Sequence, residues 1–271
     1  MAVSTKDEAV VIEYVLLGAI QGLTEFLPVS SSAHLVIAER LLGLDPPGVL
    51  LEALLHWGTL AAIVVALRKD LSDIVLSLYG RGSLERRREI GLLLAGTVPI
   101  VVVGLVARSK IDQVFSSLWS VAIGLLLTAA ALGVAQWRRR HADRSWLRFG
   151  DAMAVGLAQA ASLVPGISRS GLTISTAVAR GVAPRAAARF SFLLSIPALF
   201  GAGLVTLMSG TAREVGTTFY WPGLIVGVFT AFVVGLVTIR TLLYVIARRG
   251  LWVFAAYCAV VSVFVIVGWL I

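Results

Sequence analysis

Long apolar runs recur along the chain and are separated by short polar loops. Six of them are close to twenty residues long, which is enough for a helix to cross a bilayer core of ~30 Å. They cover approximately residues 49–68, 88–108, 117–137, 186–208, 221–244 and 251–270. The pattern predicts an all-α, polytopic integral membrane protein with six transmembrane helices. Residues 1–271 are expected to form a single membrane domain without a separate soluble part.

Two further apolar regions are interrupted by polar residues. Residues 9–43 are broken at Pro28 and at the serines that follow, and residues 150–180 are broken at Pro165 and Gly166. Each piece is too short or too polar to span the bilayer comfortably. We therefore expect two re-entrant helix pairs, which enter the membrane and return on the same side. Irregular backbone is tolerated at that depth only where it is buried in protein or lines a wet cavity.

The two broken regions resemble one another. "GAIQGLTEFLPVSSSAHL" and "GLAQAASLVPGISRSGLT" share a glycine, a glutamine, a proline and a serine cluster when one gap is allowed, and each is followed by three apolar runs. This similarity predicts a duplication, with repeat one at 9–138 and repeat two at 150–271. Because three spans are an odd number, the second copy must enter from the opposite side, which gives an inverted-topology repeat.

Composition and charge agree with a membrane protein. The chain is 58% hydrophobic and 14% charged, which is too apolar for an ordinary soluble domain. The net charge of +8 first suggests nucleic acid, but basic residues in short loops are a topology signal, so no nucleic-acid partner is expected. In the six-span arrangement, 17 of the 23 Lys and Arg fall on one side. That side should be cytoplasmic, so the first broken region enters from outside. No signal peptide is expected, because Asp7 and Glu8 precede the first apolar run.

The serine clusters stand where the returning helices begin. Serine is a favoured N-cap, and a helix start offers free N–H groups and the positive end of the helix dipole to anions. In an inverted repeat, Ser30–Ser32 and Ser168–Ser170 approach each other from opposite faces. Together with Arg169 they would form a pocket for a phosphate or diphosphate.

Acid–base groups lie close to the first cluster. Gln21 and Glu25 are four residues apart and share a helix face, and His34 can fold back across the turn beside Glu25. Glutamate, histidine and serine together can activate a nucleophile or protonate a leaving group. An ionised residue at the bilayer centre costs ~2.5–3.5 kcal/mol, so Glu25 and Arg169 should face a polar cavity and can pair. The first repeat would then supply the acid–base chemistry, and the second would hold phosphate.

The remaining polar residues are less defined. His56 is expected to pack or to hydrogen-bond to a neighbouring helix, and a contact of Glu52 with the site is left open. Metal binding is weakly indicated, since neither an H-E-x-x-H motif nor a Cys/His spacing occurs. Glu25 is the one candidate ligand for Mg²⁺ or Ca²⁺, held through a diphosphate, and one carboxylate is a poor site alone.

These residues resemble the motifs of the bacterial undecaprenyl-diphosphate phosphatase family, which is also named for bacitracin resistance. "GLTEFLPVSSSAH" resembles its first motif, "PGISRSGLT" its P-G-x-S-R-S-x-x-T motif, and "ARFSFLLSIPALFGA" the segment that follows. The resemblance covers nearly the whole chain. It implies hydrolysis of undecaprenyl diphosphate to the monophosphate lipid carrier of cell-wall synthesis, and a fold with re-entrant helices and inverted repeats.

The resemblance also implies roles for the residues at matching positions. Glu25 matches the second acid of the family's acidic motif, and Arg169 matches its phosphate-binding arginine. Ser31 and His34 match its suggested catalytic serine and histidine. The substrate-binding or phosphate-binding set comprises Gln21, Ser30, Ser32, Gly166, Ser168, Ser170 and Thr173.

The sequence departs from the family pattern at two positions. Gln21 stands where many members have Glu; because Gln is neither acid nor base, it is expected to bind substrate, water or metal. His56 stands where the resemblance leads us to expect Gln, which leaves its role open.

Two functional hypotheses follow. In the first, an enzyme, water or Ser31 attacks the terminal phosphorus of the lipid diphosphate. The alternative is a transporter or flippase of an anionic lipid such as undecaprenyl phosphate, because inverted repeats with broken helices are a transporter plan. Anion binding alone does not require Glu25 and His34, which favours the enzyme.

The expected partners are the polyprenyl diphosphate and membrane lipids, with a homodimer left open. The expected location is the bacterial plasma membrane, with the site opening to the periplasmic side.

Overall fold

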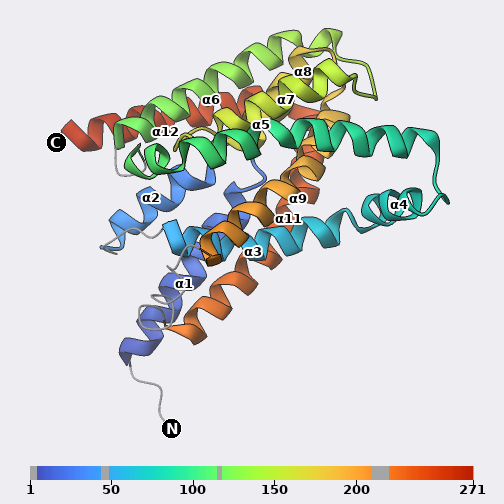
Figure 1. The fold of residues 1–271 in the computed structure, drawn as a ribbon. Helices are drawn as coiled ribbons and strands as arrows, with labels where there is room; N and C mark the ends of the chain where they lie inside the picture. Colours follow the sequence, from blue (N-terminus) through green and yellow to red (C-terminus); the bar gives the residue numbers. More distant parts are fainter. Residues whose placement is uncertain (1–4, 44–48, 115–117, 209–219, 271) are drawn as a thin grey trace.

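The computed structural model describes residues 5–43, 49–114, 118–208 and 220–270, and nearly all of them are helical (Figure 1). The helices are α1 Thr5–Thr24, α2 Ser31–Leu41, α3 Val49–Ala66, α4 Arg68–Leu78, α5 Leu84–Val114, α6 Leu118–Arg138, α7 Phe149–Ala161, α8 Arg169–Ala179, α9 Pro184–Met208, α11 Trp221–Arg249 and α12 Trp252–Leu270. A short 3₁₀ helix, Arg139–His141, continues α6. In the described part of the chain, the β-type pairing is one isolated bridge between Arg144 and Val182.

Within the described ranges, four helices are long and apolar enough to cross a membrane. They contain Leu84–Val106, Leu118–His141, Pro184–Thr206 and Trp221–Ile246, and they coincide with four of the six predicted spans. The predicted span 49–68 is α3, which bends by 74° into α4 at its end, so that this pair counts as a fifth candidate. The predicted span 251–270 is α12, whose apolar described part, Trp252–Gly268, is shorter. The helices thus fit a multi-pass membrane protein with four or five candidate spans.

Both predicted interruptions coincide with breaks between helices. The first lies between the end of α1 at Thr24 and the start of α2 at Ser31, and the second between the end of α7 at Ala161 and the start of α8 at Arg169. A proline cannot continue the hydrogen-bonding of a helix interior, and serine side chains cap a new helix start. The serines therefore explain the restarts and the prolines favour the stops, although Pro99 and Pro197 are accommodated inside α5 and α9.

Glycines allow close packing between helices that are far apart in sequence. α1 packs on α11, and α7 packs on α5. A Cβ added at Gly18 would lie 2.2 Å from the carbonyl oxygen of Gly227, and one added at Gly156 would lie 2.4 Å from that of Gly96. Small residues that bring helix backbones together are typical of membrane helix interfaces. The two contacts hold the broken helix pairs against long helices.

Replacing Gly18 by alanine is expected to destabilise the protein by about 1–3 kcal/mol, because the added methyl group overlaps the backbone of α11. The measurement is the melting temperature in detergent. Gly133→Ala is the matched control, since a Cβ there meets nothing within 4 Å. Equal melting temperatures for the two variants would contradict this account of the packing.

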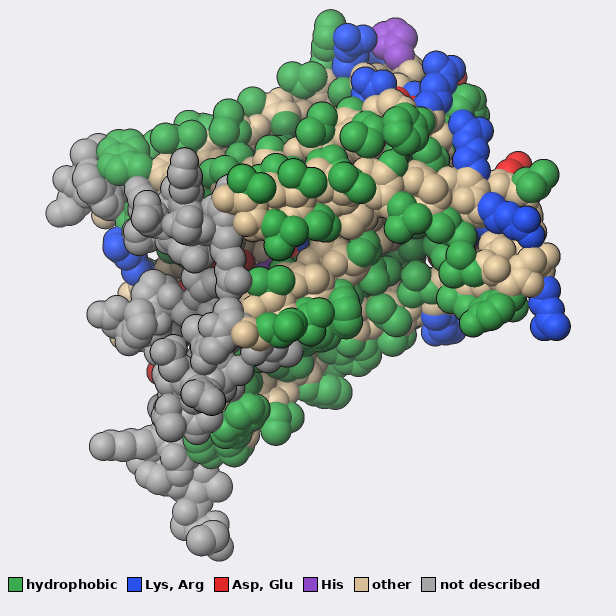
Figure 2. All heavy atoms as spheres, in the orientation of Figure 1, with side chains coloured by type: hydrophobic (Ala, Val, Ile, Leu, Met, Phe, Trp, Pro, Cys, Tyr) green, Lys and Arg blue, Asp and Glu red, His purple; other side chains and the backbone are tan. Residues whose placement is uncertain are grey.

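Lys and Arg side chains gather at one end of the molecule, the end at which α4 lies (Figure 2). Several of them pair with acids there. Arg189 Nε donates to Asp70 Oδ1 at 2.8 Å, and Arg86 Nη1 donates to Glu89 Oε2 at 2.8 Å. Arg189 also pairs with Glu89. These contacts join α4, α5 and α9 at the basic end.

Candidate active site

The site is built on two helix starts with the same construction. Ser30 is the N-cap of α2 and accepts a hydrogen bond from the backbone N–H of Ala33 at 3.4 Å. Ser168 is the N-cap of α8 and accepts one from the N–H of Gly171 at 3.0 Å. A serine cap was expected at both helix starts, and it is observed at Ser168 and, in the first cluster, at Ser30 rather than Ser32.

A second hydrogen bond is repeated within each serine cluster. The hydroxyl oxygens of Ser30 and Ser32 lie 3.2 Å apart, and those of Ser168 and Ser170 also lie 3.2 Å apart. Ser30 has a φ of 74°, and it is the one non-glycine residue with positive φ in the described ranges. Such a conformation costs ~1–3 kcal/mol and persists where the surroundings enforce it. The two clusters therefore share their side-chain contacts but not their backbone conformation, since Ser168 has a φ of −73°.

The two turns touch each other. The N–H of Gly166 donates to Ser32 Oγ at 3.5 Å, and Ser170 Oγ donates to the carbonyl oxygen of Leu27 at 3.0 Å. Gly166 has a φ of +85°, and a Cβ there would lie 2.4 Å from the carbonyl oxygen of Val121. Only glycine fits this position. The expected approach of the two helix starts is thus present in the structure.

Glu25 joins the middle residues of both clusters. Ser31 Oγ donates to Glu25 Oε2 at 2.7 Å, and the Arg169 guanidinium forms an ion pair with Glu25 Oε1. Gln21 Nε2 donates to Glu25 Oε2 at 3.1 Å. The Glu25 side chain is 3% exposed and that of Arg169 is 16% exposed. The expected pairing of Glu25 with Arg169 is therefore observed, and it links the two halves of the chain.

His56 also reaches Glu25. Its Nε2 lies 3.3 Å from Glu25 Oε2, and its Nδ1–H donates to the carbonyl oxygen of Glu52 at 2.6 Å. The sequence led us to expect packing or a hydrogen bond to a neighbouring helix, and it did not identify Glu25 as the partner. The only signal was the departure from the family pattern at this position.

His34 lies apart from this group. Its Nδ1–H donates to the carbonyl oxygen of Ser30 at 2.7 Å, and its Nε2 lies 2.8 Å from the hydroxyl of Tyr257, whose ring is stacked on it. Among the contacts of the described residues, none joins His34 to Glu25. The expectation that His34 folds back beside Glu25 therefore does not match the structure.

The other expected site residues support the second helix start. Ser168 N–H donates to Thr128 Oγ1 of α6 at 2.9 Å. Thr173 Oγ1 donates to the carbonyl oxygen of Arg169 at 2.7 Å and lies 2.6 Å from Ser191 Oγ. Thr173 therefore fixes the first turn of α8, on which Arg169 stands.

Two polar atoms at the site have no hydrogen-bond partner within the described part of the chain. These buried atoms are Arg169 Nη1 and Gln21 Oε1. A buried polar atom without a partner costs ~1–3 kcal/mol, so each of them indicates a group that binds there. Arg169 Nη1 offers a donor to an anionic oxygen. Glu25 Oε2, in contrast, is placed to accept the proton of the Ser31 hydroxyl.

The surroundings of Glu25 do not fit a metal ion. Its carboxylate is paired with the Arg169 guanidinium, whose positive charge repels a cation, and it accepts hydrogen bonds from Gln21 and Ser31. No group of three or more His, Cys, Asp or Glu able to hold a metal occurs among the described residues.

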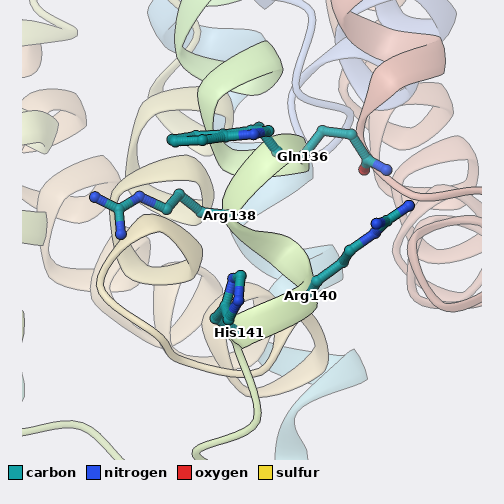
Figure 3. A pocket seen from close by; sticks show the side chains of 5 residues that line it. Gln136, Arg138, Arg140 and His141 are labelled. Carbon is teal, nitrogen blue, oxygen red and sulfur yellow. The ribbon is translucent and has the colours of Figure 1, made fainter.

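Two hollows lie elsewhere. One of about 440 Å³ at the end of α6 is lined by Gln136, Trp137, Arg138, Arg140 and His141. Figure 3 shows Arg138 and Arg140 pointing away from each other, so they do not converge on a ligand. The other, an apolar hollow of about 550 Å³ between α3 and α11, contains Leu54, Trp57 and Gly58. On a helix, Leu54 and Gly58 lie roughly opposite His56, so this hollow opens on another face of α3 than the one that contacts Glu25.

The fold and site together define a class of protein. Apolar helices that fit a multi-pass membrane protein bring a carboxylate, a serine hydroxyl and a guanidinium together at two helix starts, an arrangement suited to a phosphate-bearing ligand. The family model described as "Bacitracin resistance protein BacA" matches residues 14–264. The chain belongs to this family.

Curated relatives match almost the entire chain. An undecaprenyl-diphosphatase of Syntrophotalea carbinolica is 42% identical over 248 residues, covering 90% of this chain and 93% of the relative. An undecaprenyl-diphosphatase of Korarchaeum cryptofilum is 41% identical over 257 residues, covering 92% and 95%. One from Desulforudis audaxviator is 39% identical over 257 residues, covering 94% and 96%. The family resemblance inferred from the motifs is thus confirmed.

Proposed function

We propose that this chain is a membrane phosphatase that hydrolyses undecaprenyl diphosphate to undecaprenyl phosphate and phosphate. One observation carries the proposal: a single buried carboxylate, Glu25, contacts both the Ser31 hydroxyl and the Arg169 guanidinium. The first is a nucleophile beside a base, and the second is a donor for phosphate oxygens. The names of the curated relatives agree with this reaction. It recycles the lipid carrier for cell-wall synthesis, and this recycling confers bacitracin resistance.

The reaction breaks the bond between the terminal phosphorus and the bridging oxygen of the diphosphate. The new P–O bond comes from water or from Ser31, with Glu25 taking the proton; in the second case water then releases phosphate from the serine. Arg169 Nη1 and the N–H groups of the two helix starts stabilise the charge on the transferring phosphoryl group. His34 delivers a proton to the departing lipid phosphate. Gln21 Oε1, which has no partner among the described residues and can only accept, binds water or a protonated oxygen of the substrate.

The test is phosphate release from undecaprenyl diphosphate by the pure protein in detergent, with Glu25→Gln as the inactive comparison. Lipid movement is measured beside it in vesicles. If the wild type releases phosphate and the Glu25→Gln variant does not, the result supports the phosphatase function. Lipid movement without phosphate release would instead identify a transporter, which neither the family nor the relatives favour.

We also propose six membrane crossings and two inverted repeats, 9–138 and 150–271, in the bacterial plasma membrane. The matching contacts of α1 with α11 and of α7 with α5 support the repeat, as do the matching caps of α2 and α8. The basic end would be cytoplasmic. The first re-entrant pair would then open to the periplasm.

Cysteine labelling in whole cells tests this orientation, in a background where the buried Cys258 is replaced by serine. Ser145→Cys lies in the loop at the basic end, and Leu41→Cys lies at the exposed end of α2. An impermeant reagent added outside should label Leu41→Cys and spare Ser145→Cys. The reverse pattern would overturn the proposed topology.

A further inference from the structure

His56 is a second histidine at the site, and neither the sequence motifs nor the proposed reaction assigns it a task. It reaches across from α3 to Glu25, with 3.3 Å between His56 Nε2 and Glu25 Oε2. The two side chains are 19% and 3% exposed. A contact this deep in a membrane protein is shielded from water and is therefore stronger than one at a surface.

The hydrogen bonds of the imidazole determine where its protons lie. Nδ1–H donates to the carbonyl oxygen of Glu52, which can only accept. If the ring were neutral, Nε2 would turn a lone pair toward Glu25. Glu25 already receives hydrogen bonds from Ser31 and Gln21 and an ion pair from Arg169, which is the environment of a carboxylate. A proton on Nε2 gives His56 a donor and the Glu25 carboxylate a further hydrogen bond, so the ring is an imidazolium with two N–H donors.

The direction of this contact complements the others at Glu25. Arg169 holds Oε1, while Ser31, Gln21 and His56 all approach Oε2. Ser31 changes its partner if its hydroxyl attacks phosphorus. Gln21 lies on α1, the helix that ends directly before Glu25. His56 alone comes from α3, a helix outside both broken turns. It can therefore hold the carboxylate in place while the other partners rearrange.

We propose that His56 is a positioning residue for the reaction: its Nε2–H fixes the Glu25 carboxylate so that one oxygen faces Ser31 and the other faces Arg169. The inference rests on the proposed phosphatase function. Among the described residues, the carboxylates of Glu25 and Glu52 are the charged groups that act on His56. An imidazolium near both keeps the whole group from carrying excess negative charge, which would repel a diphosphate.

Kinetics of two variants test the role. His56→Leu removes the donor at similar size and should lower kcat by about ten- to a hundredfold, the range for a hydrogen bond to a charged group, with KM changed less than about threefold. His56→Gln offers an amide N–H in its place and should restore kcat to within about threefold of the wild type. His141→Leu makes the same change in the exposed stretch after α6 and should be neutral. Wild-type kcat in His56→Leu, or equal losses in both His56 variants, would overturn the proposal.

A spectroscopic measurement on the folded wild type does not depend on how the variants fold. The chain has three histidines, so ¹⁵N-histidine labelling gives three imidazole signals that His56→Gln assigns. Both His56 nitrogens should be protonated at neutral pH, and Glu25→Gln should return the ring to the neutral form. An unprotonated Nε2 in the wild type would contradict the proposal. A wild type that releases no phosphate would refute the phosphatase function instead, and the labelling would still decide whether His56 donates to Glu25.

Discussion

Replacing Arg169 by lysine is expected to lower kcat/KM for undecaprenyl diphosphate by about a hundredfold or more, although the positive charge is kept. Arg169 pairs with Glu25 through Nη2, and its Nη1 has no partner among the residues that the structure describes. A planar guanidinium can serve both oxygens at fixed angles, whereas an ammonium is a single point of charge. Loss of one donor to a transition-state oxyanion costs ~10²–10³ in rate.

The control is Arg180→Lys, which alters an arginine that pairs with Asp151 at the basic end. It should keep normal turnover. Arg169→Ala should in addition weaken binding of a non-hydrolysable diphosphate analogue. Glu25→Gln should behave differently and lower turnover more than analogue binding, because it removes an anion from beside an anion. Wild-type turnover in Arg169→Lys, or a Glu25→Gln variant that only loses binding, would contradict the division of roles between the two halves.

Replacing His34 by alanine is expected to lower kcat by ~10²–10⁴-fold in a folded protein, the range for loss of general acid–base help. Its Nδ1–H is committed to the carbonyl of Ser30, so Nε2 is the nitrogen that can exchange a proton with substrate. Tyr257→Phe is the control, because it keeps the stacked ring and removes only the hydroxyl near Nε2. Tyr257→Phe should lower kcat far less than His34→Ala does. Near-normal turnover of His34→Ala would make His34 a structural residue that ties down the first turn of α2.

Much of the fold follows from local signals. Length and hydropathy identified four long helices, and Pro28 and Pro165 marked the regions where the broken helices are interrupted. The bend between α3 and α4 was not predicted, because nothing at Leu67 forbids a continuous helix. It precedes a charged segment of α4, in which Asp70 pairs with Arg86 of α5 and Arg189 of α9. Tertiary contacts rather than local sequence therefore decide this feature.

The site was predicted in its chemistry better than in its contacts. Serine capping and the pairing of Glu25 with Arg169 follow from general rules about helix starts and buried charge. These rules do not decide which of the two histidines, His34 or His56, contacts Glu25. His34 is near Glu25 in sequence, but the turn between them directs its ring toward Tyr257. His56 is remote in sequence and reaches Glu25 only because α3 packs beside α1. Periodicity along one segment cannot reveal such a contact.

The ion pair between Glu25 and Arg169 joins residues that are 144 positions apart, and this separation has a consequence for biosynthesis. At ~5–20 residues per second, the ribosome completes that stretch roughly 7–30 s after Glu25 has been made. During that interval the first half of the chain enters the membrane with a carboxyl group that lacks its guanidinium partner. His56 belongs to this first half, so Glu25 meets one of its partners early. The arrival of Arg169 then supplies the partner of the other carboxylate oxygen, and the site is complete only when both halves have been inserted.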